Sequence, residues 1–78
     1  MYKVTIQATP VAESNWRVVA TGTWTPGKQP ELAPDYVLPA EVVASLFNVT
    51  PSATDKSARN QVQDGATLYA VVFRRLSK

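Results

Sequence analysis

Residues 2–9 alternate strictly between apolar and polar side chains, and this pattern constrains the fold more than any other feature of the sequence. The apolar set consists of Tyr2, Val4, Ile6 and Ala8. A period of two is typical of a strand with one buried and one solvated face. Pro10 should end this strand, because proline has no N–H to donate to a sheet ladder. The chain therefore begins with a predicted half-buried strand.

A second alternating segment spans residues 16–25 and predicts an antiparallel hairpin with the first. One of its faces carries Trp16, Val18, Ala20, Gly22 and Trp24. Gly22 in a strand interior indicates a bulge or a close backbone approach. Because both tryptophans share a face with small apolar residues, we expect them to cover the core. The alternative is that they are stacking platforms for single-stranded nucleic acid.

The last segment, residues 66–76, predicts a strand that is apolar on both faces. One face carries Leu68, Ala70 and Val72, and the other carries Tyr69, Val71 and Phe73. A strand of this kind is usually central or covered on both sides. Two covers are open for the face with Tyr69, Val71 and Phe73. It forms half of a protein interface, as in a homodimer, or the proline-rich connection 26–39 lies across it.

One helix is predicted immediately after that connection. Pro39 suits the first helical position, and Glu41 in the first turn complements the helix dipole. An apolar stripe at helical spacing follows, formed by Val42, Val43, Leu46 and Phe47. Asn48 fits the left-handed position that closes many helices.

A second helix is predicted from Pro51 to about Val62. Thr50 is a suitable N-cap, and Pro51 is a suitable first residue. Ala53, Ala58 and Val62 would face inward. Asp64-Gly65 then forms a turn before the last strand.

The predicted fold is a single α+β domain over residues 1–78 in the order β-β-α-(α)-β. It has a three-stranded, mostly antiparallel sheet with one or two helices packed on one face. A chain of 78 residues without cysteine or histidine has neither disulfides nor the usual structural metal sites to stabilise it. Self-association is another source of stability for a small domain, so a homodimer is expected.

The side-chain inventory favours a binding protein over an enzyme. Without His or Cys there is no imidazole base and no thiol nucleophile. The glycines at 22, 27 and 65 form no phosphate-binding loop. We therefore expect no catalytic residues, no cofactor and no metal. With no apolar signal core at residues 1–6 and no apolar run of membrane-spanning length, the expected location is cytoplasmic, without membrane association.

Residues 40–59 resemble a helix-turn-helix, the DNA-reading unit of small repressors. Val43 and Phe47 match core positions of the first helix, and Ala44 matches the small residue between the helices. Three residues match the turn and the next N-cap, namely Asn48, Val49 and Thr50. The sequence departs from the motif at Thr54 and Ser57, where branched apolar anchors are usual.

The resemblance implies that the second helix enters the major groove of double-stranded DNA. Its outward stripe would read bases through Ser52, Lys56, Arg59, Asn60 and Gln63. Arg74 and Arg75 would contact phosphates. The competing interpretation is that this stripe is the solvated face of a short amphipathic helix.

Two functions follow from these patterns. The first is a small non-enzymatic regulatory protein that binds DNA through the helix-turn-helix-like segment 39–63. The alternative is a protein-interaction module, such as an assembly subunit or an inhibitor of a larger complex. That module would use the apolar face of the last strand.

Overall fold

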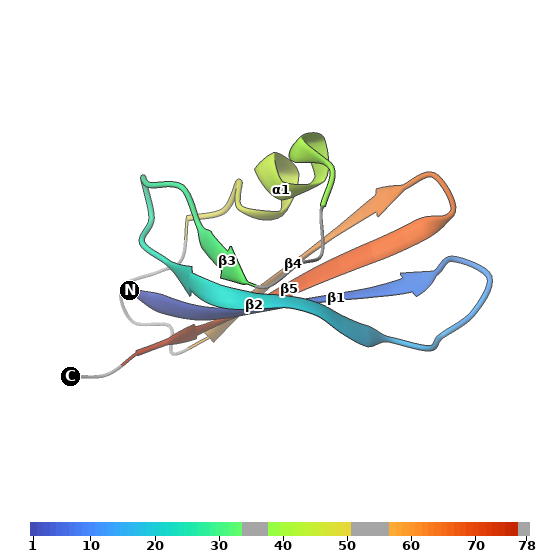
Figure 1. Ribbon diagram of the computed structural model, residues 1–78, viewed down its shortest axis with the longest axis horizontal. Helices are drawn as coiled ribbons and strands as arrows, with labels where there is room; N and C mark the ends of the chain where they lie inside the picture. The colour runs from blue at the N-terminus through green and yellow to red at the C-terminus, as the bar shows by residue number, and fades with distance from the viewer. Residues whose placement is uncertain (34–37, 51–56, 77–78) are drawn as a thin grey trace.

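The computed structural model describes residues 1–33, 38–50 and 57–76. The elements are β1 (Tyr2–Pro10), β2 (Arg17–Trp24), β3 (Glu31–Ala33), α1 (Ala40–Leu46), β4 (Ser57–Asp64) and β5 (Thr67–Arg75). The strands form one five-stranded sheet in the order β3-β2-β1-β5-β4, with every neighbouring pair antiparallel. The two termini of the described chain thus pair in the middle of the sheet, where β1 lies beside β5 (Figure 1).

The predicted three-stranded α+β fold is wrong, because the protein is mostly β with one short helix among its described residues. The predicted second helix is the main error. Residues 57–62 of that segment belong to β4, which pairs with β5 along its whole length. Residues 51–56 lie outside the described part of the chain. β3 was not predicted either.

Three predicted strands are confirmed with small shifts in their ends. Alternation placed strands at 2–9, 16–25 and 66–76, and β1, β2 and β5 occupy these segments. β1 and β2 form the expected antiparallel hairpin. The apolar stripe at 42–47 forms α1, in which Val42 and Leu46 are buried.

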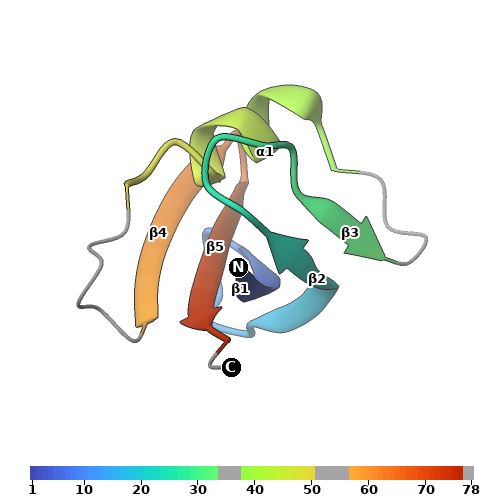
Figure 2. The ribbon, with the colours of Figure 1, turned by 90° about the vertical axis from the view of Figure 1, so that its left-hand side faces the viewer.

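The sheet curves around α1, as Figure 2 shows, so that the helix covers the concave face of the sheet. Side chains that alternate along the strands build the core beneath α1. They include Val4 and Ile6 of β1, Ala20 and Trp24 of β2, and Tyr69, Val71 and Phe73 of β5. The opposite, convex face has no helix over it in the described part of the chain (Figures 1 and 2).

Aromatic rings form the centre of the core. The Phe73 ring lies 5.0 Å from Trp24, 5.4 Å from Phe47 and 6.4 Å from Tyr2, measured between ring centroids. These distances lie within the range of favourable aromatic pairs. Phe73 itself is fully buried. It therefore joins β1, β2 and the residue that follows α1 into one cluster.

Gly22 is required by a close backbone approach, one of the two explanations that the sequence offered. It lies opposite Leu32 of β3, and a Cβ atom at residue 22 would fall 1.9 Å from the Glu31 carbonyl oxygen. No side chain fits at that distance, so glycine allows β3 to pair with β2. The bulge occurs elsewhere. Ile6 pairs with Ala20 and Gln7 with Val18, which leaves Val19 as the extra residue on β2.

The bulge changes the predicted faces of β2. Strict alternation placed Val18 with Ala20 and Trp24 on the core face. Because Val19 interrupts the register, Val18 instead lies beside Gln7 on the convex face and is 56% exposed. The same shift places Arg17 opposite Ala8, on the concave face.

Candidate nucleic-acid interface

The residues predicted to read DNA do not share one helix. Ser52 and Lys56 lie outside the described residues. Arg59 and Gln63 are exposed on the convex face of β4. Arg74 is exposed on β5, and Arg75 is exposed at the end of that strand. The helix-turn-helix interpretation is wrong, because the second half of its reading helix is an edge strand.

Asn60 has a structural role rather than the predicted base-reading one. Its side-chain Nδ2 donates to the carbonyl oxygens of Ser45 at 3.0 Å and Leu46 at 3.1 Å. These are carbonyls of the last turn of α1, where the regular helical ladder ends. The Ser45 carbonyl also accepts from the Asn48 backbone N–H at 3.3 Å. Asn48 does not close the helix in the left-handed conformation as predicted, since no described non-glycine residue has a positive φ. The contact from β4 takes over part of that role.

We expect Asn60→Ala to lower the free energy of unfolding by about 1–2 kcal/mol, because two carbonyls lose a shared donor at a partly buried site. Urea denaturation followed by tryptophan fluorescence measures this change. Gln61→Ala is the matched control, because Gln61 is the adjacent, exposed residue of β4. Equal stability of the two variants would contradict the role assigned to Asn60.

The apolar face of β5 that was predicted as a protein interface lies inside the molecule. Tyr69, Val71 and Phe73 are 6%, 0% and 0% exposed, and all three belong to the core cluster together with Val42 and Leu46 of α1. α1 packs on this face, and Leu32 and Leu38 of the proline-rich connection 26–39 pack against the same core cluster, so the face is buried within a single chain. A charge at Val71 would therefore test folding and would not report on an interface.

The convex face brings together basic side chains from both ends of the described chain. Lys3 of β1 lies directly opposite Arg74 of β5. Arg59 of β4 lies opposite Val72, two residues from Arg74 and thus diagonal to it. We call Lys3, Arg59 and Arg74 the basic triad. All three are exposed.

The basic triad is poorly neutralised by its surroundings. Opposed residues in an antiparallel sheet have Cβ atoms about 4.5–5.5 Å apart, and like charges placed so are destabilising. The one carboxylate among the described strand residues of this face is Glu31, which is separated from Lys3 by Thr23 of β2. No ion pair involving the triad is formed within the described ranges. The arrangement is therefore suited to an external anion.

Most side chains around the triad are polar or small, while the exposed valines Val18 and Val72 lie on the same face. The surrounding residues comprise Thr5 and Gln7 of β1, Thr21 and Thr23 of β2, Ser57, Gln61 and Gln63 of β4, and Ala70 and Val72 of β5. Hydroxyl and amide groups of this kind donate to phosphate oxygens. No aromatic side chain occupies a convex-face position of a described strand.

The prediction that the tryptophans cover the core is confirmed for Trp24 but not for Trp16, which is not among the side chains that form the core or pack against it. Trp24 is 4% exposed, and its Nε1 donates to the Lys28 carbonyl oxygen at 2.9 Å. Trp16 is half-buried just before β2. Stacking of bases on Trp24 is excluded by its burial.

Sequence reasoning found two members of the basic triad, Arg59 and Arg74, but not Lys3. Lys3 is one of the polar residues of the alternating segment 2–9, for which a solvated strand face was predicted. The pairing of β1 with β5 brings it to Arg74, and that pairing joins opposite ends of the described chain. The alternating patterns predicted both strands, but neither pattern indicated that the two strands pair with each other.

Two further findings concern metal binding and membrane spans. Among the described residues, no cluster of three or more His, Cys, Asp or Glu side chains is placed to hold a metal ion. Within the same ranges, no helix combines the length and the apolar character needed to span a bilayer. No protein-family profile, curated protein or solved structure matches this chain. Its function is therefore inferred from its own residues and their arrangement.

Proposed function

We propose that this protein binds nucleic acid through the basic triad on the convex face of its sheet. The observation that carries the proposal is the direct opposition of Lys3 and Arg74, with Arg59 diagonal to Arg74 on the next strand. Two adjacent cations without a nearby carboxylate reduce stability in the free protein. A bound phosphate backbone removes that repulsion and releases its own condensed counterions.

The contacts are to the sugar-phosphate backbone rather than to bases. Base reading in the major groove usually uses an inserted helix or ribbon, and single-strand readers use exposed aromatic rings. The triad lies instead on the face of a five-stranded sheet, and no aromatic side chain of a described strand lies on that face. Binding is therefore independent of sequence, and its affinity is set mainly by the number of phosphates neutralised.

The salt dependence of binding tests the proposal. We expect labelled oligonucleotides to bind at low salt, as measured by fluorescence anisotropy. Three neutralised phosphates give a slope of log K against log salt of about −2.7 for duplex DNA and about −2.1 for a single strand. Absence of binding at low salt and tens of micromolar protein would contradict the proposal, since non-specific binders typically reach about 1–100 µM even at physiological salt.

A matched pair of arginine variants separates the triad from net charge. Arg74→Gln should reduce the salt slope by about 1 and weaken binding about equally for all sequences. Arg17→Gln removes the same charge from the concave face and should leave both quantities almost unchanged. If the two variants lose affinity equally, binding depends on total charge and the convex face is not the site.

A further inference from the structure

A second candidate site lies on the concave side, at the free end of the β1–β2 hairpin, and is separate from the basic triad. It is a hollow of about 360 Å³ whose apolar part is formed by Ala8, Pro10 and Val19. Its polar part is formed by Glu13, Asn15, Arg17 and Thr67. Ligand pockets typically have volumes of about 300–1,000 Å³, with a few polar groups that orient the ligand. This hollow is at the small end of that range.

The β-bulge at Val19 directs Arg17 into this hollow. Without the bulge, alternation from Ala20 would place Arg17 on the convex face. With it, Arg17 lies opposite Ala8 on the concave face, and Val18 is 56% exposed on the other side. Leaving a valine exposed forgoes part of the roughly 1.5–3 kcal/mol that its full burial would contribute. Bulges often re-aim a side chain next to a functional site, and here the side chain is a guanidinium.

The turn that carries Glu13 and Asn15 is held firmly against β1. Thr9 is a buried polar residue at 2% exposure. Its hydroxyl donates to the Glu13 carbonyl oxygen at 3.1 Å and accepts from the Asn15 backbone N–H at 2.9 Å. The Val11 N–H also donates to the Ala66 carbonyl oxygen at 2.8 Å, which ties this turn to the β4–β5 turn. These contacts hold the backbone of the turn from which the Glu13 and Asn15 side chains extend.

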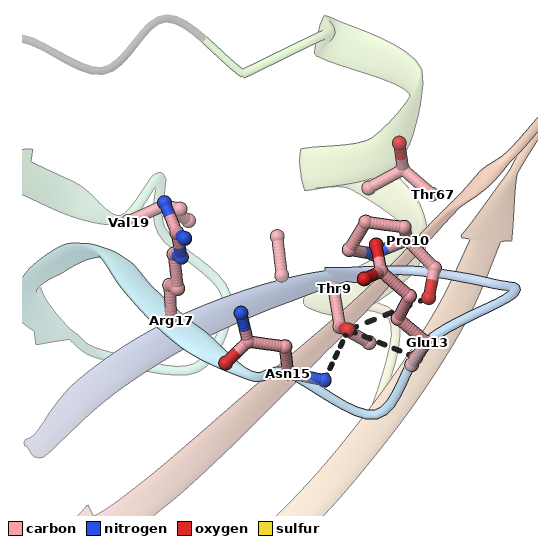
Figure 3. A pocket seen from close by; sticks show the side chains of 8 residues that line it. Thr9, Pro10, Glu13, Asn15, Arg17, Val19 and Thr67 are labelled. Atoms are coloured by element: carbon pink, nitrogen blue, oxygen red, sulfur yellow. Dashed lines mark hydrogen bonds between the residues drawn. The ribbon is translucent and has the colours of Figure 1, made fainter.

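The two oppositely charged side chains of the hollow, Arg17 and Glu13, do not form an ion pair with each other. In Figure 3, Arg17 and Glu13 lie on opposite sides of the hollow, with Asn15 between them. A cation at one side, an anion at the other and apolar side chains from the strands complement a ligand with two charged ends and an apolar body.

We propose that this hollow binds a small apolar zwitterion, an amino acid or a dipeptide with an aliphatic side chain. The ligand carboxylate accepts from the Arg17 guanidinium, with the Asn15 amide beside it. The ligand ammonium donates to the Glu13 carboxylate. The aliphatic side chain lies against Ala8, Pro10 and Val19. Bidentate guanidinium–carboxylate pairing is the strongest of these contacts.

Glycyl-leucine and leucine are the probes, and backbone amide shifts in ¹H–¹⁵N correlation spectra are the readout. We expect saturable shifts at Ala8, Asn15, Val19 and Thr67, and the tighter of the two probes identifies the ligand length. Glycyl-leucinamide and N-acetyl-glycyl-leucine each lack one charge, and each should bind about tenfold more weakly, a loss equal to about 1.4 kcal/mol. These ligand changes need no protein variant, so they cannot be confused with misfolding.

Protein variants complete the thermodynamic cycle. Arg17→Gln should lower the affinity for glycyl-leucine about tenfold. It should bind glycyl-leucinamide as tightly as the wild type does, because that ligand lacks the carboxylate that Arg17 would contact. Glu13→Gln should behave in the same way toward the N-acetyl peptide. Lys28→Gln removes the same charge at an exposed position outside both sites, so it is the control and should have no effect. Absence of saturable shifts, or equal binding by wild type and Arg17→Gln, would overturn the proposal.

Discussion

Replacing Phe73 with alanine is expected to lower the free energy of unfolding by about 3–5 kcal/mol, the usual loss for a buried aromatic residue. Phe73 is fully buried, and its ring contacts Tyr2, Trp24 and Phe47. A chain of 78 residues has a total stability of about 4–12 kcal/mol. The loss is a large fraction of this total, so the variant should unfold at a much lower urea concentration than the wild type.

Urea denaturation followed by near-ultraviolet circular dichroism measures the loss, because the signal depends on the packed rings. Val72→Ala is the matched control, since it removes an apolar side chain from the adjacent position on the convex face, where Val72 is 38% exposed. The control should lose less than about 1 kcal/mol. A Phe73→Ala variant that is as stable as the control would show that the aromatic cluster does not hold the core together.

Replacing Gly22 with alanine is expected to lower the free energy of unfolding by about 2–3 kcal/mol and to detach β3. Alanine usually stabilises relative to glycine by about 0.4–1 kcal/mol, because it restricts the unfolded chain. At Gly22 the clash is larger than this gain. The new Cβ would lie 1.9 Å from the Glu31 carbonyl oxygen and 2.9 Å from the Leu32 Cα, which are both backbone atoms.

Hydrogen exchange at the backbone amides of β2 and β3 measures the detachment directly. In Gly22→Ala the amides that join β2 to β3 should exchange faster, while those that join β1 to β5 remain protected. Thr21→Ala is the matched control, because Thr21 is exposed on the same strand. Unchanged protection of β3 in the glycine variant would contradict the close approach.

The central strands could be predicted because their patterns are local. β1 alternates strictly, and β5 is apolar on both faces, as a strand with two sheet neighbours usually is. The structure places both in the interior of the sheet. The sequence did not show that β5 pairs with both β1 and β4. Pairing between distant segments leaves no pattern in either segment alone.

β4 was mistaken for a helix because its apolar residues fit both periods. Ala58 and Val62 are four positions apart, a spacing that places them on one face of a helix and also on one face of a strand. Asn60 lies between them on the same strand face, where its amide binds the end of α1. Asn60, which binds the carbonyls at the end of α1, was therefore mistaken for part of a solvated helical stripe.

The two candidate sites depend on features that a single sequence does not display. The basic triad exists because β1 and β4 both pair with β5. The hollow contains Arg17 because one residue, Val19, is unpaired in the register of β2. Both are properties of pairing between strands, so the charged residues were visible in the sequence while their grouping was not.

Chemical-shift mapping with an unlabelled oligonucleotide tests the nucleic-acid proposal most directly. Added to ¹⁵N-labelled protein at low salt, the oligonucleotide should shift the backbone amides of Lys3, Thr5, Arg59, Val72 and Arg74, which lie together on the convex face. The amides of α1, on the opposite side of the sheet, should remain in place. Shifts concentrated on α1, or no shifts at all, would contradict binding through the basic triad.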